Sequence, residues 1–275
     1  MKDLHIHTIY SDGEYNEFEI LEKIIQAGIT EFAICDHDTI EGSQKVYNIL
    51  KEKNIPIKFH SGIELSCRAN NFLDGINIHL LVRDFDYNDE NIKELIQEMN
   101  TFRLLKIKTM VDRIKEKFDI TIPQKDIEET LKTTNSFGKP HMLEILKKYI
   151  DIDREVYYKA MKKLPTEDLK LDAIKVIKLM KNTTANVTLA HPIEVMEDYD
   201  LSYDELEDFI KYLKDCGLDG LETKHSKHTL ENYVKFSKMA KKYNLKETEG
   251  SDYHGQKVKP DVHLGIFEKP IIRKK

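Results

Sequence analysis

Histidines and carboxylates recur in this sequence within or directly after short apolar runs. His5 and His7 form an H-x-H pair in the first run, and Asp252 and His254 form a D-x-H pair near the other end of the chain. Because side chains alternate along a strand, both members of such a pair lie on one face, spaced to share a metal ion. The other candidates of these types are Asp12, His37, Glu64, His79 and His191. The nine residues together predict a metal centre.

Several of these signals also have an ordinary interpretation. Asp12 precedes Gly13 and would suit a turn, whereas His37 lies in a polar segment that would suit a solvated loop. His79 interrupts an apolar run, where a hydrogen-bonded core histidine is common. We favour metal binding because six histidines and three carboxylates at the ends of six predicted strands are hard to explain as packing.

The donor types restrict the ions and the reaction. The set contains neither the cysteines of a structural zinc site nor the oxygen-only shell of calcium, so it suits two to three ions of zinc, manganese or iron. Three divalent ions against three carboxylates leave a local charge of about +3, which suits a bridging hydroxide and a phosphate dianion. We therefore expect phosphoryl transfer to water, with the identity of the metal left open.

The elements that must position these residues alternate between strand and helix patterns, as in βα units. Strands are predicted at residues 4–6, 32–35, 57–63, 76–82, 187–190, 220–222 and 245–247, and helices at 17–27, 42–53, 203–216 and 229–243. Asn16 and Glu19 resemble a capping box at the start of the first helix, which Gly28 ends. Seven strands joined by helices predict an α/β fold with a parallel, barrel-like sheet, whose carboxyl edge would gather the candidate ligands.

A long middle segment lacks strand signals. Between about Asp89 and Lys181 the apolar residues follow a helical period instead. We expect an inserted helical subdomain at residues 100–183 and a metal-binding barrel formed by residues 1–99 and 184–275.

The overall composition excludes several classes of protein. The chain has 275 residues, of which 40% are hydrophobic and 33% charged, as in a folded domain rather than a disordered one. A net charge of -6 argues against an extended nucleic-acid surface. The start has no secretory pattern, the longest apolar runs are too short to cross a membrane, and the three cysteines form no metal motif, so we expect a cytoplasmic protein with reduced thiols.

The ordered set of motifs resembles the PHP (polymerase and histidinol phosphatase) superfamily. The motifs are D-L-H-I-H-T at 3–8, Y-S-D-G at 10–13, D-H-D-T at 36–39, G-I-E at 62–64, I-H-L-L at 78–81, A-H-P at 190–192 and G-S-D-Y-H-G at 250–255. The resemblance implies a distorted seven-stranded (β/α) barrel with a trinuclear metal centre. The implied ligand sets are His5, His7, Glu64 and Asp252 for one ion, Glu64, His79 and His191 for the second, and Asp12, His37 and His254 for the third. Among these we expect Glu64, Asp252 and His191 to act most directly in catalysis.

The D-H-D-T motif and the insertion are most similar to the subgroup of nucleoside 3',5'-bisphosphate phosphatases and a 5'-end exoribonuclease. Members of that subgroup commonly bind the substrate phosphate through an R-P-H segment, which here is Lys139-Pro140-His141. Lysine is a point charge where arginine offers a two-pronged donor, so substrate preference is left open. A loop containing Lys224, His225 and His228 also resembles a substrate-side segment, although it suits an ordinary polar loop equally well.

The leading hypothesis is hydrolysis of a phosphomonoester by attack of a metal-bound hydroxide. The expected substrate is a small phosphorylated molecule, such as a nucleoside 3',5'-bisphosphate or a short 5'-phosphorylated oligonucleotide. The alternatives are a histidinol-phosphate phosphatase and a non-catalytic metal-stabilised scaffold. A two-metal amide hydrolase is disfavoured because no predicted strand ends in the lysine that would bridge its metals. The sequence leaves the oligomeric state open.

Overall fold

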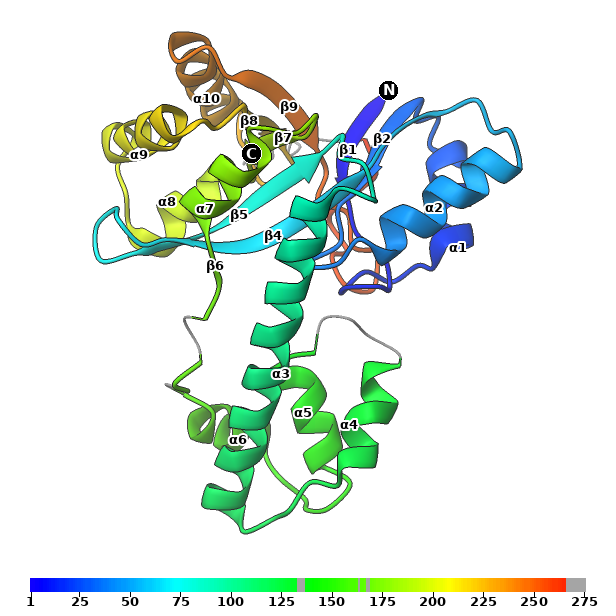
Figure 1. Ribbon diagram of the computed structural model, residues 1–275, viewed down its shortest axis with the longest axis vertical. Helices are drawn as coiled ribbons and strands as arrows, with labels where there is room; N and C mark the ends of the chain where they lie inside the picture. Colours follow the sequence, from blue (N-terminus) through cyan, green and yellow to red (C-terminus); the bar gives the residue numbers. More distant parts are fainter. Residues whose placement is uncertain (133–136, 163, 167–168, 266–275) are drawn as a thin grey trace, which may run out of the picture.

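The computed structural model describes residues 1–132, 137–162, 164–166 and 169–265, which form strands and helices in mixed order (Figure 1). The strands are β1 (Lys2–Ile6), β2 (Glu31–Ile34), β3 (Lys58–His60), β4 (Gly62–Ala69), β5 (Ile76–Arg83), β6 (Leu171–Asp172), β7 (Asn186–Leu189), β8 (Gly220–His225) and β9 (Lys246–Gly250). The helices are α1 (Glu17–Gln26), α2 (Glu41–Glu52), α3 (Glu90–Phe118), α4 (Gln124–Leu131), α5 (Lys139–Leu146), α6 (Arg154–Ala160), α7 (Ala173–Met180), α8 (Pro192–Tyr199), α9 (Tyr203–Cys216) and α10 (Leu230–Lys242).

The strands form two sheets that meet along two seams. One sheet has the order β1-β2-β3, and the other has the order β6-β4-β5-β7-β8-β9. Isolated parallel bridges join Ile6 to Tyr253 at one seam and His37 to Glu64 at the other. In Figure 1, α1 and α2 cover the first sheet, whereas α8, α9 and α10 lie on the far side of the second. The predicted α/β class is confirmed.

The strand pattern differs from the prediction in two respects. The single strand predicted at residues 57–63 divides at Ser61 into β3 and β4, each of which pairs within a different sheet. The expectation of a parallel sheet is wrong for β5, which runs antiparallel to both β4 and β7. The cause is the short connection after Ala69, which includes Gly75 at φ 92° and returns the chain directly beside β4. Parallel neighbours would require a long crossover instead. A closed seven-stranded barrel stays a prediction.

Local signals account for the helices around the sheets. The side chain of Asn16 accepts hydrogen bonds from the backbone of α1 while Glu19 returns to the Asn16 N–H, so the predicted capping box is confirmed. Helix α9 begins after Ser202, which forms the same motif with Glu205, and ends at Gly217 with φ 118°. Such local rules explain why the predicted limits of both helices agree with the structure to within a residue.

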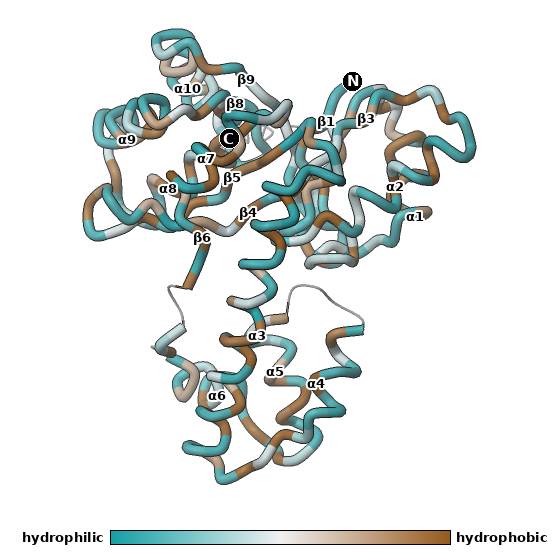
Figure 2. The backbone as a smooth tube through the Cα atoms, in the orientation of Figure 1, coloured by the Kyte–Doolittle hydropathy of each residue, from teal (hydrophilic) through white to brown (hydrophobic). Residues whose placement is uncertain are grey.

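The 29-residue helix α3 connects two hydrophobic cores (Figure 1). Ile92 and Met99 in its first half pack into the core around the second sheet, whereas Ile107 and Ile114 pack with α4, α5 and α6 in a separate lobe. Figure 2 shows apolar segments in both the sheet-containing body and this lobe. Helix α7 lies within the predicted insertion at 100–183 but packs into the first core. The second core therefore draws on a shorter stretch than the predicted subdomain.

Candidate metal centre

Each predicted ligand is carried by a strand or by the turn that follows one. His5 lies on β1 and His7 directly after it, while His37 follows β2 and His191 follows β7. Glu64 was expected to close a strand, but it is the third residue of β4, because β4 begins only at Gly62. The remaining positions are His79 in the middle of β5, Asp12 in the turns after β1, and Asp252 and His254 after β9.

Glu64 lies at the centre of the assembled side chains and is fully buried. Its two carboxylate oxygens face five histidines from four different strands or strand ends. Oε2 lies 3.1 Å from His5 Nε2, 3.1 Å from His7 Nε2 and 3.2 Å from His37 Nδ1. Oε1 lies 3.0 Å from both His79 Nδ1 and His191 Nε2. A single carboxylate therefore contacts most of the predicted histidines.

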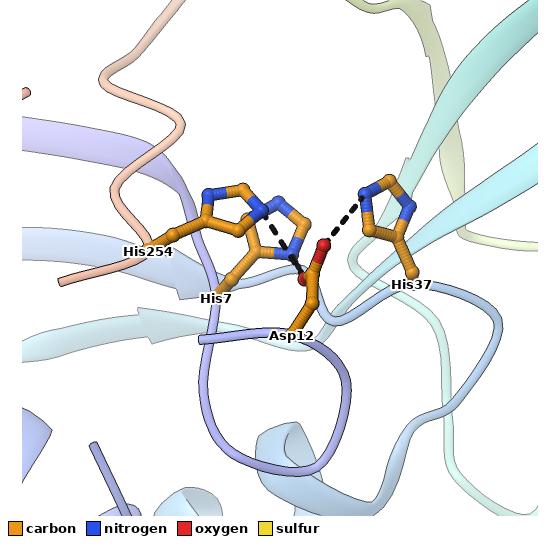
Figure 3. Close-up of side chains that lie close together, drawn as sticks. All are labelled: His7, Asp12, His37 and His254. Atoms are coloured by element: carbon orange, nitrogen blue, oxygen red, sulfur yellow. Dashed lines mark ion pairs between the residues drawn. The ribbon is translucent and has the colours of Figure 1, made fainter. Parts of the chain in front are cut away.

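Two further carboxylates extend the cluster on the side of His7. Asp252 Oδ1 lies 3.3 Å from His7 Nε2 and 3.4 Å from His254 Nδ1. Asp12 Oδ1 lies 3.2 Å from His254 Nε2, and Asp12 Oδ2 lies 3.9 Å from His37 Nε2. Figure 3 shows the Asp12 carboxylate pointing among the rings of His7, His37 and His254. The structure thus brings all nine predicted ligands into one continuous group.

The donor atoms fit cations better than they fit one another. Four buried polar atoms have no properly aligned hydrogen-bond partner in the described ranges: His5 Nε2, His7 Nε2, His37 Nδ1 and Glu64 Oε2. The three ring nitrogens nevertheless lie within 3.2 Å of Glu64 Oε2. Buried polar atoms without partners destabilise a fold unless something else satisfies them. A shared divalent ion would satisfy them, and imidazole with carboxylate suits zinc, manganese or iron.

The donor sets differ in detail from those implied by the resemblance. Donor atoms within 4.8 Å of one another form four sets: His5, His7, Glu64 and Asp252; His7, Asp12, His37 and His254; His37, Glu64 and His79; and His5, Glu222 and His225. Four residues, His5, His7, His37 and Glu64, thus belong to two sets each, and Glu222 enters one that was not predicted. The division of ligands among individual ions stays a prediction.

The histidines keep the central carboxylates ionised. Burial by itself would raise the pKa of Glu64, but the charges of His37, His5 and His79 hold that pKa well below its usual value. The pKa of Asp252 is likewise held well below its usual value against burial, mainly by hydrogen bonds from His225 and His7. Both groups therefore remain negatively charged at neutral pH, as metal ligands must be.

Glu222 on β8 supports two of the ligands and was not among the predicted site residues. It is fully buried, and its Oε1 lies 3.1 Å from His5 Nδ1. Its Oε2 accepts the backbone N–H of His191 at 2.7 Å, which stabilises the unusual left-handed φ of 24° at that residue. Against burial, the charges of His5 and His225 lower the pKa of Glu222 to about 2. Its position at the end of a predicted strand was the same signal that indicated the other ligands.

The three residues of the predicted β8 substrate loop lie in different environments. His225 is fully buried, with Nε2 3.5 Å from Asp252 Oδ2, so it belongs to the cluster of candidate ligands rather than to the surface. His228 is also buried; its Nδ1–H donates to the Thr223 carbonyl at 2.9 Å, and burial lowers its pKa to about 3. Lys224 points to the outer face, where its Nζ lies 3.3 Å from Glu249. The structure brings only His225 to the ligands, and the substrate-binding roles stay predictions.

Helix α5 of the helical lobe begins with Lys139 and carries His141 in its first turn. His141 Nδ1 accepts the Gly138 N–H at 3.1 Å, so the ring helps to start the helix. Burial lowers the pKa of His141, and the negative charge of Asp12 opposes this shift. The carboxylate of Asp12, one of the candidate ligands, is thus close enough to affect the pKa of His141.

Comparison with known proteins agrees with this geometry. Residues 3–217 match the family model described as the PHP domain. A phosphoribosyl 1,2-cyclic phosphate 1,2-diphosphodiesterase of Eggerthella lenta is 26% identical over 93% of this chain and 95% of its own length. A 5'-3' exoribonuclease of Haemophilus influenzae is 24% identical over 92% of this chain and 89% of its own length. A 3',5'-nucleoside bisphosphate phosphatase of Chromobacterium violaceum is 21% identical over 92% of this chain and 86% of its own length.

Solved structures with the same fold are also known. A Bifidobacterium adolescentis protein assigned as a metal-dependent phosphoesterase superimposes with a TM-score of 0.72 at 25% identity, over 98% of this chain and 92% of its own. A Chromobacterium violaceum structure described as an amidohydrolase superimposes with a TM-score of 0.71 at 18% identity, over 98% of this chain and 94% of its own. This similarity supports the fold alone. Across the described ranges, no helix is both long and apolar enough to span a bilayer.

Proposed function

The chain belongs to the PHP domain family and is a metal-dependent phosphoesterase, and we propose that it hydrolyses a phosphomonoester of a substrate that carries at least two phosphate groups. The proposed substrate class is a nucleoside 3',5'-bisphosphate or a short 5'-phosphorylated oligonucleotide. The observation that carries the proposal is the buried Glu64, surrounded by five histidines whose facing atoms fit cations.

The roles proposed for the side chains follow from their contacts. Divalent ions bound here would activate water and neutralise the phosphoryl oxygens. Glu64 and Asp252, whose pKa values are held well below the usual ones, would hold these ions as ionised carboxylates. Glu222, which accepts the backbone N–H of His191, and Glu194, whose carboxylate lies 3.0 Å from its Nδ1, would help to position His191. Lys139 and His141 are proposed to bind a substrate phosphate from the α5 side.

The choice of substrate class is supported by what the relatives share. Their names specify a phosphoribosyl cyclic phosphate, a nucleoside bisphosphate and an RNA chain. Each of these molecules carries more than one phosphate. A catalytic role rather than that of a scaffold is supported by the presence of all nine ligands in one cluster.

A cyclic phosphodiester is the second candidate substrate. It is favoured by the Eggerthella lenta relative, which matches nearly the full length of both chains. Opening a five-membered cyclic phosphate places the same demands on the ions as a monoester does, namely water activation and neutralised phosphoryl oxygens.

A substrate screen of the manganese-loaded protein tests the proposal. The substrates are adenosine 3',5'-bisphosphate, a 5'-phosphorylated RNA trinucleotide, phosphoribosyl 1,2-cyclic phosphate and histidinol phosphate. We expect the highest kcat/KM on one of the first two. Preference for the cyclic phosphate would select the second candidate, preference for histidinol phosphate would replace the proposal, and no turnover with metals bound would indicate a scaffold.

A further inference from the structure

A cationic pocket lies beside the metal centre, where α3 leaves the second sheet. It is lined by Arg103 and Lys106 of α3, by Asp38 and Ser66, by Lys170, and by apolar side chains that include Phe102 and Phe137. We propose that this pocket binds the substrate phosphate that is not hydrolysed. The inference rests on the proposed function, because it assumes a substrate with two phosphate groups.

The backbone connects the pocket directly to the metal ligands. Ser66 follows Glu64 by two residues on β4, so both side chains face the same side of the sheet, about 7 Å apart. Asp38 follows His37, and its carboxylate accepts the Ser66 N–H at 2.8 Å while its own N–H donates to the Glu64 carbonyl at 2.9 Å. Successive phosphates of a nucleotide are separated by a comparable distance. One phosphate at the metals would therefore place another in the pocket.

The charge of the pocket favours an anion. Arg103 and Lys106 of α3 line the pocket beside one carboxylate, Asp38, in a chain whose net charge is -6. Burial lowers the pKa values of both Arg103 and Lys106, and Asp38 only partly opposes this shift. Partly buried cations in excess over their carboxylate would be stabilised by a bound dianion.

Lys170 extends the cationic surface toward the ligands. It directly precedes β6, whose Leu171 pairs with Cys67 of β4, so Lys170 lies beside Ser66. It also lines a second hollow that contains His79 and His191. A substrate that spans the pocket and the metal centre would pass this lysine.

The apolar lining indicates what accompanies the phosphate. Phe102 of α3 lines the pocket and is only partly buried, whereas Phe137 is buried in the helical lobe, with its ring centroid 5.7 Å from that of His141. Aromatic rings beside a phosphate site are suited to stacking a nucleobase. The favoured ligand is thus a phosphate attached to a nucleoside, present either in a nucleoside bisphosphate or as the next phosphate of an RNA chain.

Two substitutions and a matched control test the pocket. Lys106→Gln and Lys170→Gln each remove one cation from a different side of it. Lys108→Gln removes one from the exposed face of α3, where Lys108 pairs with nearby Asp112. Kinetics are measured with adenosine 3',5'-bisphosphate, the 5'-phosphorylated trinucleotide and p-nitrophenyl phosphate, which has a single phosphate.

We expect each pocket substitution to raise KM for the two-phosphate substrates and to lower their kcat/KM, relative to p-nitrophenyl phosphate, by roughly ten- to a hundredfold, as for a lost charge-assisted hydrogen bond. The control should keep the wild-type ratio. The bisphosphate should also bind the chelator-treated wild type more tightly than chelator-treated Lys106→Gln by calorimetry. A loss confined to the bisphosphate or to the trinucleotide would identify which of them supplies the phosphate.

The results separate this inference from the proposed function. If the wild type hydrolyses two-phosphate substrates but the ratios and calorimetric affinities of the pocket variants equal those of the control, the pocket proposal is wrong and the function stands. If the wild type hydrolyses p-nitrophenyl phosphate but neither two-phosphate substrate, the proposed function itself fails. Circular dichroism and thermal melts test whether each variant folds. If Lys106→Gln or Lys170→Gln does not fold, the methionine substitution at the same position takes its place.

Discussion

The buried carboxylate of Glu64 illustrates how single residues determine this centre. Removing an ionised carboxylate from water is costly unless positive charge surrounds it. Five histidines surround Glu64, and the charges of His37, His5 and His79 hold its pKa below the usual value against burial. The side chain is therefore available in its charged form to bridge ions.

Glu64→Gln replaces one oxygen by an amide nitrogen and removes the negative charge. We expect a loss of activity of at least about a hundredfold, with reduced metal content, as for other disrupted metal sites. Phosphate release and elemental analysis measure both effects. Glu90→Gln, at an exposed glutamate of α3, is the control. Wild-type turnover by Glu64→Gln at matched metal loading would remove Glu64 from the centre.

Glu222 contacts two of the candidate ligands, His5 and His191, and we predict that it positions them rather than binding an ion itself. Glu222→Gln can still accept the His191 N–H but loses the charge beside His5. We expect metal affinity to fall about tenfold to a hundredfold, while activity at saturating metal is largely retained. A metal titration of the rate measures this separation. The control is Glu249→Gln on the outer face of β9. An unchanged metal affinity would show that Glu222 has only a packing role.

At the scale of elements, His60 joins strands at the end of the sheet away from the ligands. Its ring on β3 contacts Glu31 of β2 at 2.9 Å and also Asp84, which follows β5. The hydrogen bond with Asp84, opposed by burial, raises the pKa of His60. The folded state therefore binds the His60 proton more tightly than the unfolded state does.

The contribution of His60 to stability changes with pH in a definite direction. The stabilisation by His60 is fully present below its unfolded pKa of about 6.5 and is lost as the pH rises through the higher folded value. We expect His60→Asn to lower the free energy of unfolding by about 1 kcal/mol at pH 6 and by less at pH 9. Urea denaturation at constant metal concentration measures this difference, with His263→Asn as the control. An equal loss at both pH values would contradict the charge-based explanation.

At the scale of the whole molecule, the candidate metal centre joins both sheets. Its ligands range from His5 on β1 to His254 after β9, and the bridge between His37 and Glu64 lies at a seam. Bound ions would therefore stabilise the assembled sheets, since separated strands cannot provide the same ligands.

Removal of the ions should consequently destabilise the fold. An ion at a thousand times its Kd stabilises the native state by about 4 kcal/mol, so chelation should lower the Tm by roughly 10 °C. Calorimetry with and without chelator measures the shift, and added manganese should restore it. An unchanged Tm after elemental analysis has verified metal removal would show that the ions do not contribute to folding.

Some features could be predicted from the sequence because they depend on neighbouring residues. The limits of α1 and α9 follow from capping residues and helical spacing within a few positions. The H-x-H and D-x-H pairs are similarly local, since strand geometry or a tight turn brings their members together. The order of the motifs then indicated the family.

Other features were decided only by the tertiary structure, because they depend on contacts between distant segments. The direction of β5 depends on the hairpin that returns it to β4. Glu222 was predicted at the end of a strand, but only folding places it beside His5, 217 positions away. The cationic pocket likewise combines a helix, a strand and the residue before β6. Long-range contacts of this kind depend on how whole elements pack, and local spacing carries no information about that packing.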